Sequence, residues 1–369
     1  MRHAIIGAGF GADVHFPAFA GLPNVEVVAI SDSGSGRAKR LALEGVATYS
    51  NWQYMLDEVR PDSLSVAVPP VAQKEIVIQA TQRGIHVLCE KPFGMGAEDA
   101  VAMLDAALEA RIVGAVGFQF RFEPGISELY TQVVAGRIGQ VRRVDFAWFT
   151  SGRASATRPW SWQHAAANGG GVVNAFLPHV VDLLLWLTGS SVTSVAGRTA
   201  VLVPQRLDYS GAVREVTAED VVDALLELEN GSVGSVRVTN CQPAGEGMRI
   251  ELHGDKGVLQ FIHRSPFRCK DARLTYYRPE SAPELIEPAD SRQQESDTRS
   301  IPFQGLARQF VSAVQGKPSS ELPTFYDGLR VQRVMTTLRL AVEKRAFVDI
   351  HDVSGLYPAE SNNDDKRFE

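Results

Sequence analysis

The sequence predicts an α/β fold in two parts, a doubly wound parallel sheet followed by a second α/β region with a mostly antiparallel sheet. In residues 1–122, short apolar runs alternate with helical stretches, which is typical of βαβ units. After Pro124 the apolar residues alternate with a period of two, as in strands with one exposed face. Asn230-Gly231 separates two such runs and favours a hairpin, because both turn positions require a positive φ.

Five apolar runs in the first part predict strands that are buried on both faces of a parallel sheet. They are residues 3–6, 25–31, 63–68, 86–89 and 113–118. The predicted helices between them are residues 37–44, a segment ending near 59, 72–83 and 97–111. Ser50-x-x-Gln53 resembles a capping box for the second of these helices. Pro17 lies in the helical stretch after the first strand and is expected to kink or shorten it.

The second part contains more strands and fewer helices. Its predicted strands are residues 140–150, 192–203, 221–228, 232–239, 248–253 and 258–262, and its predicted helices near the end are 305–315 and 328–344. Residues 280–299 are polar and are expected to form a long loop. The predicted domains are therefore 1–122 and 123–350, followed by a polar tail at 351–369.

Composition narrows the class of protein. The chain has 369 residues, of which 44% are hydrophobic and 22% charged, as in ordinary globular proteins of about two domains. The net charge of −6 does not favour a nucleic-acid partner. Cys89, Cys241 and Cys269 are few and far apart, so we expect no disulfide framework, no metal site and a reducing, cytoplasmic location. Residues 180–187 are too short an apolar run to span a membrane, and no secretory signal opens the chain.

A glycine cluster, GAGFGA, follows the first predicted strand and has the dinucleotide-binding form GxGxxA. Gly7 permits the tight turn, Gly9 lacks the Cβ that would block a pyrophosphate, and Ala12 keeps the following helix close to the strand. The backbone around Phe10 and Gly11 then lies at the start of a helix, where unpaired amides favour anions. The cluster predicts a Rossmann fold with a bound NAD or NADP.

Asp32 stands at the end of the next predicted strand, 20 residues past Ala12, where an acid binds the ribose hydroxyls. A carboxylate there favours NAD, because it repels the 2′-phosphate of NADP. Ser33 and Arg37 could offset that repulsion, so NADP stays open. The alternative is an ordinary glycine-rich turn with a helix-capping aspartate.

Five stretches carry a resemblance to the Gfo/Idh/MocA family of NAD(P)-dependent sugar and polyol oxidoreductases. They are GAGFGADVHFPAF at 7–19, the first proline of VAVPP at 66–70, GIHVLCEKPFG at 84–94, VGFQFRFEP at 116–124 and GGGVVNAFLPHVVD at 169–182. The resemblance extends to about residue 350. It implies a Rossmann domain, a second α/β domain with a large open antiparallel sheet, a homodimer or homotetramer formed through that sheet, and a small sugar-like substrate.

The resemblance implies that Lys91 is the functional lysine. An ammonium group stabilises the alkoxide that forms during hydride transfer and can pass on a proton. The end of a strand is also where open α/β sheets bind ligands, although a solvated surface lysine is the alternative. His179 matches the family's histidine, a candidate general acid or base. Asp182, three residues later, could orient the imidazole or make a structural hydrogen bond instead.

One position departs from the family pattern. Many members have an aspartate four residues before the histidine, where this chain has Ala175, and a glycine is common where it has Leu177. Asn174 could make a polar contact but cannot act as a base. Lys91 is therefore the stronger candidate than His179 for the acid–base role.

The remaining candidates come from the matched motifs. Expected cofactor contacts, besides the glycine cluster and the ribose site, are Pro69, Gln73, Glu90, Lys91 and Gln119; expected substrate contacts are Lys91, Arg121, Trp160, Trp162, Asn174 and His179. Arg121 could instead serve the junction between the two parts, and the tryptophans could be ordinary core residues. His15 is expected to serve helix packing, and glycines 169–171 to let the backbone approach the nicotinamide side.

Three functions fit these residues. The first is an NAD(P)-dependent oxidoreductase that moves a hydride between nicotinamide and a carbon of a sugar, polyol or keto-sugar. The second is an NAD-dependent glycosidase that uses transient oxidation and elimination. The third is a non-catalytic NAD(H)-sensing protein, which only the missing aspartate supports. Residues 151–168 and 204–217 are expected to decide the substrate.

Overall fold

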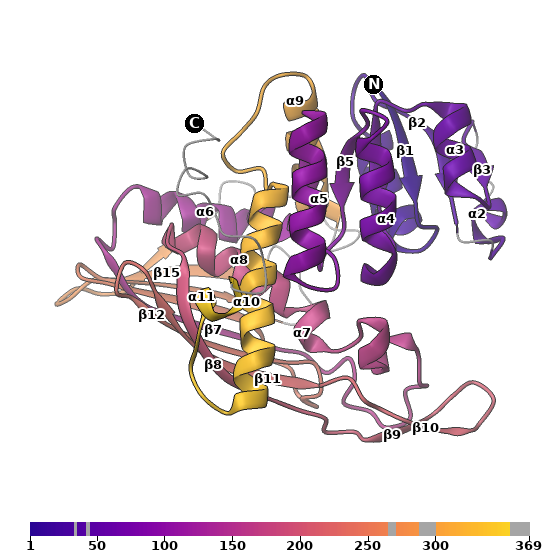
Figure 1. Ribbon diagram of the computed structural model, residues 1–369. Helices are drawn as coiled ribbons and strands as arrows, with labels where there is room; N and C mark the ends of the chain where they lie inside the picture. The colour runs from indigo at the N-terminus through magenta and orange to yellow at the C-terminus, as the bar shows by residue number, and fades with distance from the viewer. Residues whose placement is uncertain (33–34, 42–44, 265–270, 288–299, 355–369) are drawn as a thin grey trace.

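The computed structural model describes residues 1–369 apart from 33–34, 42–44, 265–270, 288–299 and 355–369. Its two parts lie one above the other in Figure 1, with the strands of the first part near the N-terminus and a broad sheet below. This arrangement confirms the predicted fold class. Ser33, Cys269 and most of the predicted tail lie outside the described residues, and Cys89 and Cys241 are free and buried.

The first part is built on a six-stranded sheet whose paired strands are all parallel. Its order is β3-β2-β1-β4-β5-β6, so the chain winds outward from β1 in both directions, as in doubly wound folds. The strands are β1 Arg2–Ile6, β2 Glu26–Ser31, β3 Ala47–Tyr49, β4 Ser63–Val66, β5 His86–Cys89 and β6 Gly114–Val116. All carboxyl ends meet at one edge, which faces the second part.

The helices of this part follow the predicted order with some changes at their ends. They are η1 Gly11–His15, α1 Phe16–Ala20, α2 Arg37–Arg40, α3 Trp52–Val59, α4 Pro70–Thr81 and α5 Ala97–Ala110. Pro17 is near the start of α1, directly after the π-helical turn η1, so the expected interruption is present. The capping box at Ser50 is wrong, because Asn51 caps α3 by accepting a hydrogen bond from the Tyr54 amide at 2.7 Å.

The second part is built on a nine-stranded sheet in the order β16-β15-β14-β13-β7-β12-β11-β8-β17. Only β7 and β12 pair in parallel, which confirms a mostly antiparallel sheet. The strands are β7 Val141–Phe149, β8 Val192–Ala200, β11 Val221–Leu228, β12 Val233–Thr239, β13 Gly247–Gly254, β14 Val258–His263, β15 Ala272–Tyr277, β16 Glu284–Ile286 and β17 Val348–Asp349.

Two details of this sheet bear on the predictions. Strands β11 and β12 form the hairpin expected at Asn230-Gly231, where Gly231 has φ 80°. The predicted loop at 280–299 is wrong at Glu284–Ile286, which pairs with β15 as strand β16, and its residues 288–299 lie outside the described residues. Residues 204–217, also expected as a loop, contain a small separate hairpin of β9 Gln205–Leu207 and β10 Val213–Glu215.

Helices cover one face of the large sheet and leave the other open. The covering helices include α8 Leu177–Thr188 and α10 Phe325–Lys344, and α6 Pro124–Val134 packs beside β14 and β15. On the open face, Asp145, Glu251 and His253 bring potential ligand atoms within 4.8 Å of one another. Arg143 and Arg249 form ion pairs with the two carboxylates, which makes this a charge network. Assembly through this face stays a prediction.

The chain returns to the first part near its end. Helix α9, Ser300–Val314, packs against α1 and η1, with Phe303 and Phe310 fully buried there. Helix α10 runs from beside α5 down over β8 (Figure 1). Helix α11, Ile350–Ser354, occupies the first described residues of the predicted tail. The proposed domain limits stay predictions.

No single helix among the described residues is long and apolar enough to cross a membrane. One bent pair, 166–175 with 177–188, passes by length and composition, but most of α8 is buried in the protein.

Candidate active site

The glycine cluster is shaped by close backbone contacts on one side and open space on the other. Gly7 has φ 122°, and a Cβ there would lie 2.2 Å from the carbonyl oxygen of Ala67. A Cβ on Gly11 would lie 2.8 Å from Ile5, so Gly11 also keeps the turn close to β1, while Ala12 packs on the same apolar cluster as Ile5. Among the described residues, a Cβ on Gly9 would meet only the Arg37 guanidinium, at 3.8 Å. Open space above Gly9, next to a cation, suits a pyrophosphate.

Asp32 lies directly after β2 at the same edge of the sheet. Its Oδ2 accepts a hydrogen bond from the Ala38 amide at 2.7 Å, and the side chain is largely buried. The helix-capping role considered as an alternative is therefore present in the structure. A ribose contact by Asp32 stays a prediction, and the Ser33 contact lies outside the described residues.

The segment after β5 is held in place by Gln73. Its Nε2 donates to the Glu90 carbonyl at 2.8 Å, and its Oε1 accepts from the Gly94 amide at 2.8 Å. Both ends of the amide thus bind the protein's own backbone, so the geometry supports a structural role for Gln73 rather than the predicted cofactor contact. The Lys91–Pro92 peptide bond within this segment is cis, and Pro69 precedes the first turn of α4 at the same edge.

Lys91 reaches across to the second part of the chain. Its Nζ donates to the carbonyl oxygen of Ala175 at 3.0 Å, in the short helix α7, Val172–Ala175. Burial lowers the pKa of Lys91, and the nearby Glu90 carboxylate partly offsets that effect. Ala175, which stands where many family members have an aspartate, therefore accepts a hydrogen bond from the Lys91 ammonium through its backbone carbonyl. A lysine whose pKa is lowered loses its proton at a pH closer to neutral than a free lysine does, which favours a role in proton transfer.

His179 lies at the start of α8 in an aromatic environment. Its ring meets Phe120 edge-on with centroids 4.8 Å apart, and Phe118 and Trp148 stand about it at 6.2 Å and 6.3 Å. Burial, with a smaller contribution from the charge of Lys91, holds the pKa of His179 well below its usual range. Its buried Nδ1 has no hydrogen-bond partner among the described residues. The imidazole is therefore neutral at pH 7 and retains an unused nitrogen.

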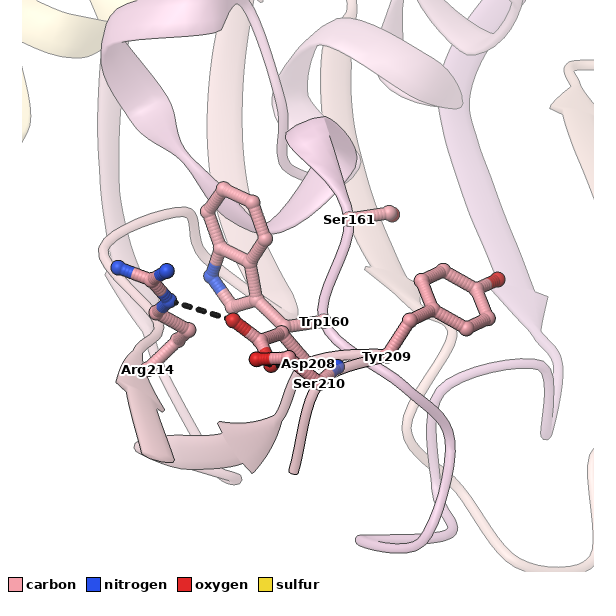
Figure 2. Close-up of a pocket in the computed structure, with 6 residues that line it drawn as sticks. All are labelled: Trp160, Ser161, Asp208, Tyr209, Ser210 and Arg214. Atoms are coloured by element: carbon pink, nitrogen blue, oxygen red, sulfur yellow. Dashed lines mark hydrogen bonds and ion pairs between the residues drawn. The ribbon is translucent and has the colours of Figure 1, made fainter. Parts of the chain in front are cut away.

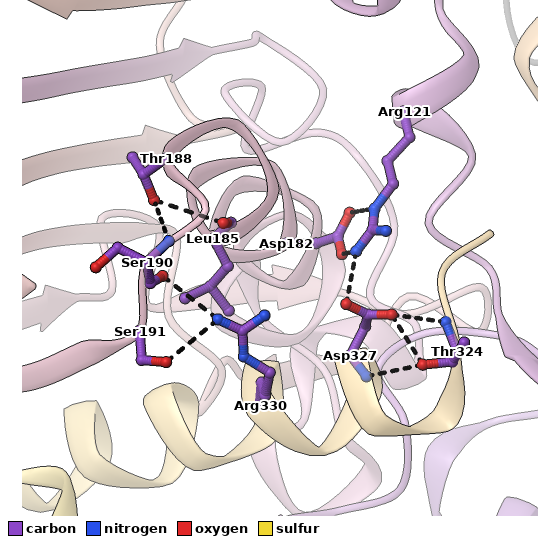
Figure 3. Close-up of polar contacts among 9 residues, drawn as sticks. All are labelled: Arg121, Asp182, Leu185, Thr188, Ser190, Ser191, Thr324, Asp327 and Arg330. Atoms are coloured by element: carbon purple, nitrogen blue, oxygen red, sulfur yellow. Dashed lines mark hydrogen bonds and ion pairs between the residues drawn. The ribbon is translucent and has the colours of Figure 1, made fainter. Parts of the chain in front are cut away.

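Of the two roles considered for Asp182, the structure shows the structural hydrogen bond and not the orientation of His179. Figure 3 shows its carboxylate facing the Arg121 guanidinium, and Arg121 Nε donates to Asp182 Oδ2 at 3.0 Å. Arg121 also pairs with Asp327 at 3.1 Å, and Asp327 caps α10 through Thr324. The Arg121 side chain is only 3% exposed. The geometry therefore supports the junction role of Arg121, and its contact with a substrate gains no support.

The other predicted substrate contacts also have partners within the protein. Asn174 donates to the Gly170 carbonyl at 3.3 Å and accepts from Arg339 at 2.6 Å. Trp160 Nε1 donates to the Glu215 carbonyl at 3.0 Å. Trp162, the first residue of the short helix η3 (Trp162–His164), is 45% exposed.

Trp160 also lines a shallow pocket beside the β9–β10 hairpin. Figure 2 shows its ring next to the hairpin turn, with the Asp208–Arg214 ion pair nearby and the Tyr209 ring turned outward. The two polar groups already satisfy each other. The pocket therefore lies in the two regions, 151–168 and 204–217, that are expected to decide the substrate, and its lining does not identify a particular substrate.

Together these residues form an edge that fits a dinucleotide. The space at Gly9 is suited to a pyrophosphate, and Asp32 follows β2 at the same edge, where a ribose contact stays a prediction. Gln119, in the 3₁₀ turn η2 Gln119–Phe122 after β6, has a buried Oε1 with no partner among the described residues. An orphaned amide oxygen is suited to a ligand's amide or hydroxyl donor. The site thus joins a cofactor edge to Lys91 and His179.

Sequence reasoning missed several contributors to this site. The role of the Ala175 carbonyl could not be predicted, because every residue has a backbone carbonyl and only the tertiary fold brings this one to Lys91. Phe120 lies inside the matched VGFQFRFEP motif, and Trp148 lies in a predicted strand. Their proximity to His179 depends on the crossing of η2, β7 and α8.

Two family models match the chain. The model described as "Oxidoreductase family, NAD-binding Rossmann fold" matches residues 1–118, and the GFO/IDH/MocA C-terminal domain matches residues 126–260. The fold and the site, with these matches, define an NAD-dependent oxidoreductase of the sugar and inositol dehydrogenase class. The chain belongs to the Gfo/Idh/MocA family, whose named members are dehydrogenases.

Several relatives match nearly the whole chain. An uncharacterized oxidoreductase of Synechocystis is 27% identical over 361 residues, covering 96% of this chain and 97% of the relative. The levoglucosan dehydrogenase of Pseudarthrobacter phenanthrenivorans is 24% identical over 390 residues, covering 96% and 99%. An oxidoreductase domain protein from Kribbella flavida has a TM-score of 0.85 at 26% identity, covering 94% and 98%. A levoglucosan dehydrogenase complex with NADH and levoglucosan shares the fold, with a TM-score of 0.83 at 22% identity, covering 95% and 98%.

Proposed function

We propose that this protein is an NAD-dependent dehydrogenase or ketoreductase that acts on a ring or chain carbon of a sugar, polyol or keto-sugar. The observation that carries the proposal is the Lys91 ammonium at the cofactor edge, 3.0 Å from the Ala175 carbonyl and electrostatically coupled to His179. A proton-transferring amine, a neutral imidazole and a dinucleotide edge are the parts that such a reaction requires. The named relatives that act on levoglucosan, inositols and glucose 6-phosphate support the substrate class.

The cofactor would be held by the Gly7–Ala12 turn, Asp32, Arg37 and Gln119. A nicotinamide bound there would supply the hydride chemistry that interconverts a hydroxyl-bearing carbon and a ketone. Lys91 holds the proton at Nζ: its neutral amine takes the hydroxyl proton in oxidation, and its ammonium returns it in reduction. Its lowered pKa keeps both forms accessible closer to neutral pH.

His179 has a different part in this proposal. Because its pKa lies well below the usual range, the ring stays uncharged and does not store the proton. Its free nitrogen can instead fix the substrate oxygen by a hydrogen bond. The aromatic side chains around it exclude water, which strengthens the polar contacts inside the site.

A screen of NAD and NADP against sugars, polyols, keto-sugars and nucleotide sugars, read by NADH or NADPH absorbance, tests the proposal. Lys91→Ala should lower kcat by about 10²–10⁴-fold while cofactor affinity is kept. A near-full rate in that variant would contradict the mechanism. Cleavage of a nitrophenyl glycoside without accumulation of NADH would favour the elimination route instead.

A further inference from the structure

A continuous chain of buried hydrogen bonds crosses the six-stranded sheet and ends beside Lys91. Ser63 Oγ lies 2.8 Å from His3 Nδ1, and His3 Nε2 lies 3.0 Å from Ser65 Oγ. Ser65 Oγ lies 2.9 Å from His15 Nδ1, and His15 Nε2 lies 3.2 Å from Glu90 Oε1. Glu90 is 7% exposed, and the other four residues are fully buried.

The chain runs from one edge of the sheet to the other. His3 and Ser63 are paired near the amino-terminal ends of β1 and β4, whereas Glu90 follows the carboxyl end of β5. Apolar side chains enclose it, since Phe19 stacks on His3 at 3.7 Å between ring centroids and a second phenylalanine, from α9, packs on His15. Polar groups persist in such a core only when each is hydrogen-bonded. An unbroken chain meets that condition.

The chemistry of the groups gives the chain a direction. An ionised Glu90 carboxylate only accepts hydrogen bonds, so His15 donates from Nε2 and accepts at Nδ1. Ser65 must therefore donate to His15 and accept from His3 Nε2, which leaves His3 Nδ1 to accept from Ser63. Burial, with a smaller effect of His15, holds the pKa of His3 well below its usual range. All four links are satisfied when both imidazoles are neutral and Glu90 carries its charge.

The second oxygen of Glu90 faces the catalytic lysine. Glu90 Oε2 accepts from the Lys91 amide at 3.2 Å, and the carboxylate is the one charge that raises the pKa of Lys91 against its burial. The other titratable groups facing this pair are His15 from η1, Cys89 from β5 and His179 from α8. Because Cys89 and His179 stay uncharged, Glu90 is the group that can set the charge of Lys91.

We propose that the Ser63–His3–Ser65–His15 hydrogen-bond chain holds the Glu90 carboxylate in place beside Lys91, and that Glu90 in turn holds the proton on Lys91. The four residues of the chain are positioning residues, because none of them touches the reacting atoms. The proposal rests on the proposed function only in its consequence for catalysis. The charge of Lys91 can be measured without any substrate.

The first test reads Lys91 directly in the full-length protein. Acetic anhydride labelling at Lys91, measured by peptide mass spectrometry across pH, reports the fraction of neutral amine. Glu90→Gln should lower the apparent pKa of Lys91 by about one unit and raise labelling at a fixed pH below that pKa by up to roughly tenfold. His15→Asn and Ser65→Ala should shift it in the same direction by less. Equal labelling in wild type and Glu90→Gln would overturn the proposal.

Thr81→Val is the matched control, because it removes a buried hydroxyl that bonds only within α4. It should change the melting temperature without moving the Lys91 titration. If Glu90→Gln shifts that titration but neither His15→Asn nor Ser65→Ala does, the chain is packing only and its proposed role is wrong. The two chain variants are independent, so a folding failure of one leaves the other to decide.

Histidine-selective ¹⁵N spectra measure the protonation state and tautomer of each imidazole, which side-chain packing alone would not determine. His3 and His15 should both appear as neutral Nε2–H tautomers between pH 6 and 8, at about the range where free imidazoles titrate. An imidazolium signal or an Nδ1–H tautomer for either residue would overturn the direction of the chain. If the spectra and the labelling both match these expectations while no substrate is turned over, the proposed function is wrong, and the proposed role of the hydrogen-bond chain is kept.

Discussion

The two sides of the active site differ in how much their residue types reveal. On the cofactor side, a Cβ would collide with neighbouring segments at Gly7 and Gly11 but not at Gly9, which is the arrangement that the glycine motif predicts. On the substrate side, polar candidates such as Asn174 and Arg121 turn out to bind other parts of the protein. Backbone geometry follows from residue type, whereas the partner of a long polar side chain depends on the tertiary fold.

The largest expected effect tests the substrate side. Asp182→Ala leaves the buried Arg121 with Asp327 alone and should lower the free energy of unfolding by about 3–5 kcal/mol. Chemical denaturation measures it. The exposed pair Arg198–Asp223 is the control, and Asp223→Ala should cost about 0–1 kcal/mol. Similar losses in both variants would mean that Asp182 is not part of a buried junction.

The second prediction separates two glycines on the cofactor side. Gly9→Val places a side chain in the space proposed for the pyrophosphate, so it should weaken NAD binding by about 1–3 kcal/mol, roughly 5- to 150-fold in Kd. Because its Cβ meets no backbone of the described residues, the melting temperature should not change. Gly7→Ala should instead destabilise the fold, because its Cβ meets the Ala67 carbonyl. NADH fluorescence titration and thermal unfolding measure the pair. The reverse pattern would refute this assignment.

The third prediction restores the family's carboxylate. Ala175→Asp introduces a charge at the residue whose carbonyl binds Lys91, and should raise the pKa of Lys91 by about one unit. Since the neutral amine is the base, the acidic limb of kcat/KM for oxidation should move to higher pH. Ala175→Asn, with the same shape and no charge, should leave the limb in place. If the acidic limb did not move in Ala175→Asp, the side chain at position 175 would have no effect on the pKa of Lys91.

The last prediction concerns the junction beside η2, where the effect on stability is gradual with pH. Burial raises the pKa of Glu123 from 4.5 to about 7, although its side chain also caps α6. Between those values the folded state binds the extra proton, so stability should fall as pH rises, by about 1.4 kcal/mol per pH unit. Glu123→Gln should flatten that slope in denaturation curves at pH 5, 6 and 7. A slope unchanged by the substitution would place the titration elsewhere.

Sequence patterns predicted the order of the sheets, the hairpin at Asn230-Gly231 and the glycine turn because each depends on local periodicity or on φ. They could not show that Gln73 binds the backbone of residues 90 and 94, or that Asp182 turns from His179 to Arg121. Those choices depend on which segments meet across the junction. The motif match found Lys91 and His179 without their immediate surroundings.

Helix α9 has a consequence for how the protein is made. Phe303 and Phe310 come from beyond residue 300, yet they close the apolar surface over η1 and α1. During translation, the N-terminal half emerges early, but its apolar surface over η1 and α1 stays uncovered until most of the polypeptide has left the ribosome. A fragment ending near residue 122 should consequently aggregate in solution. The N-terminal half should therefore not fold as an independent unit when it is transferred to another protein without α9.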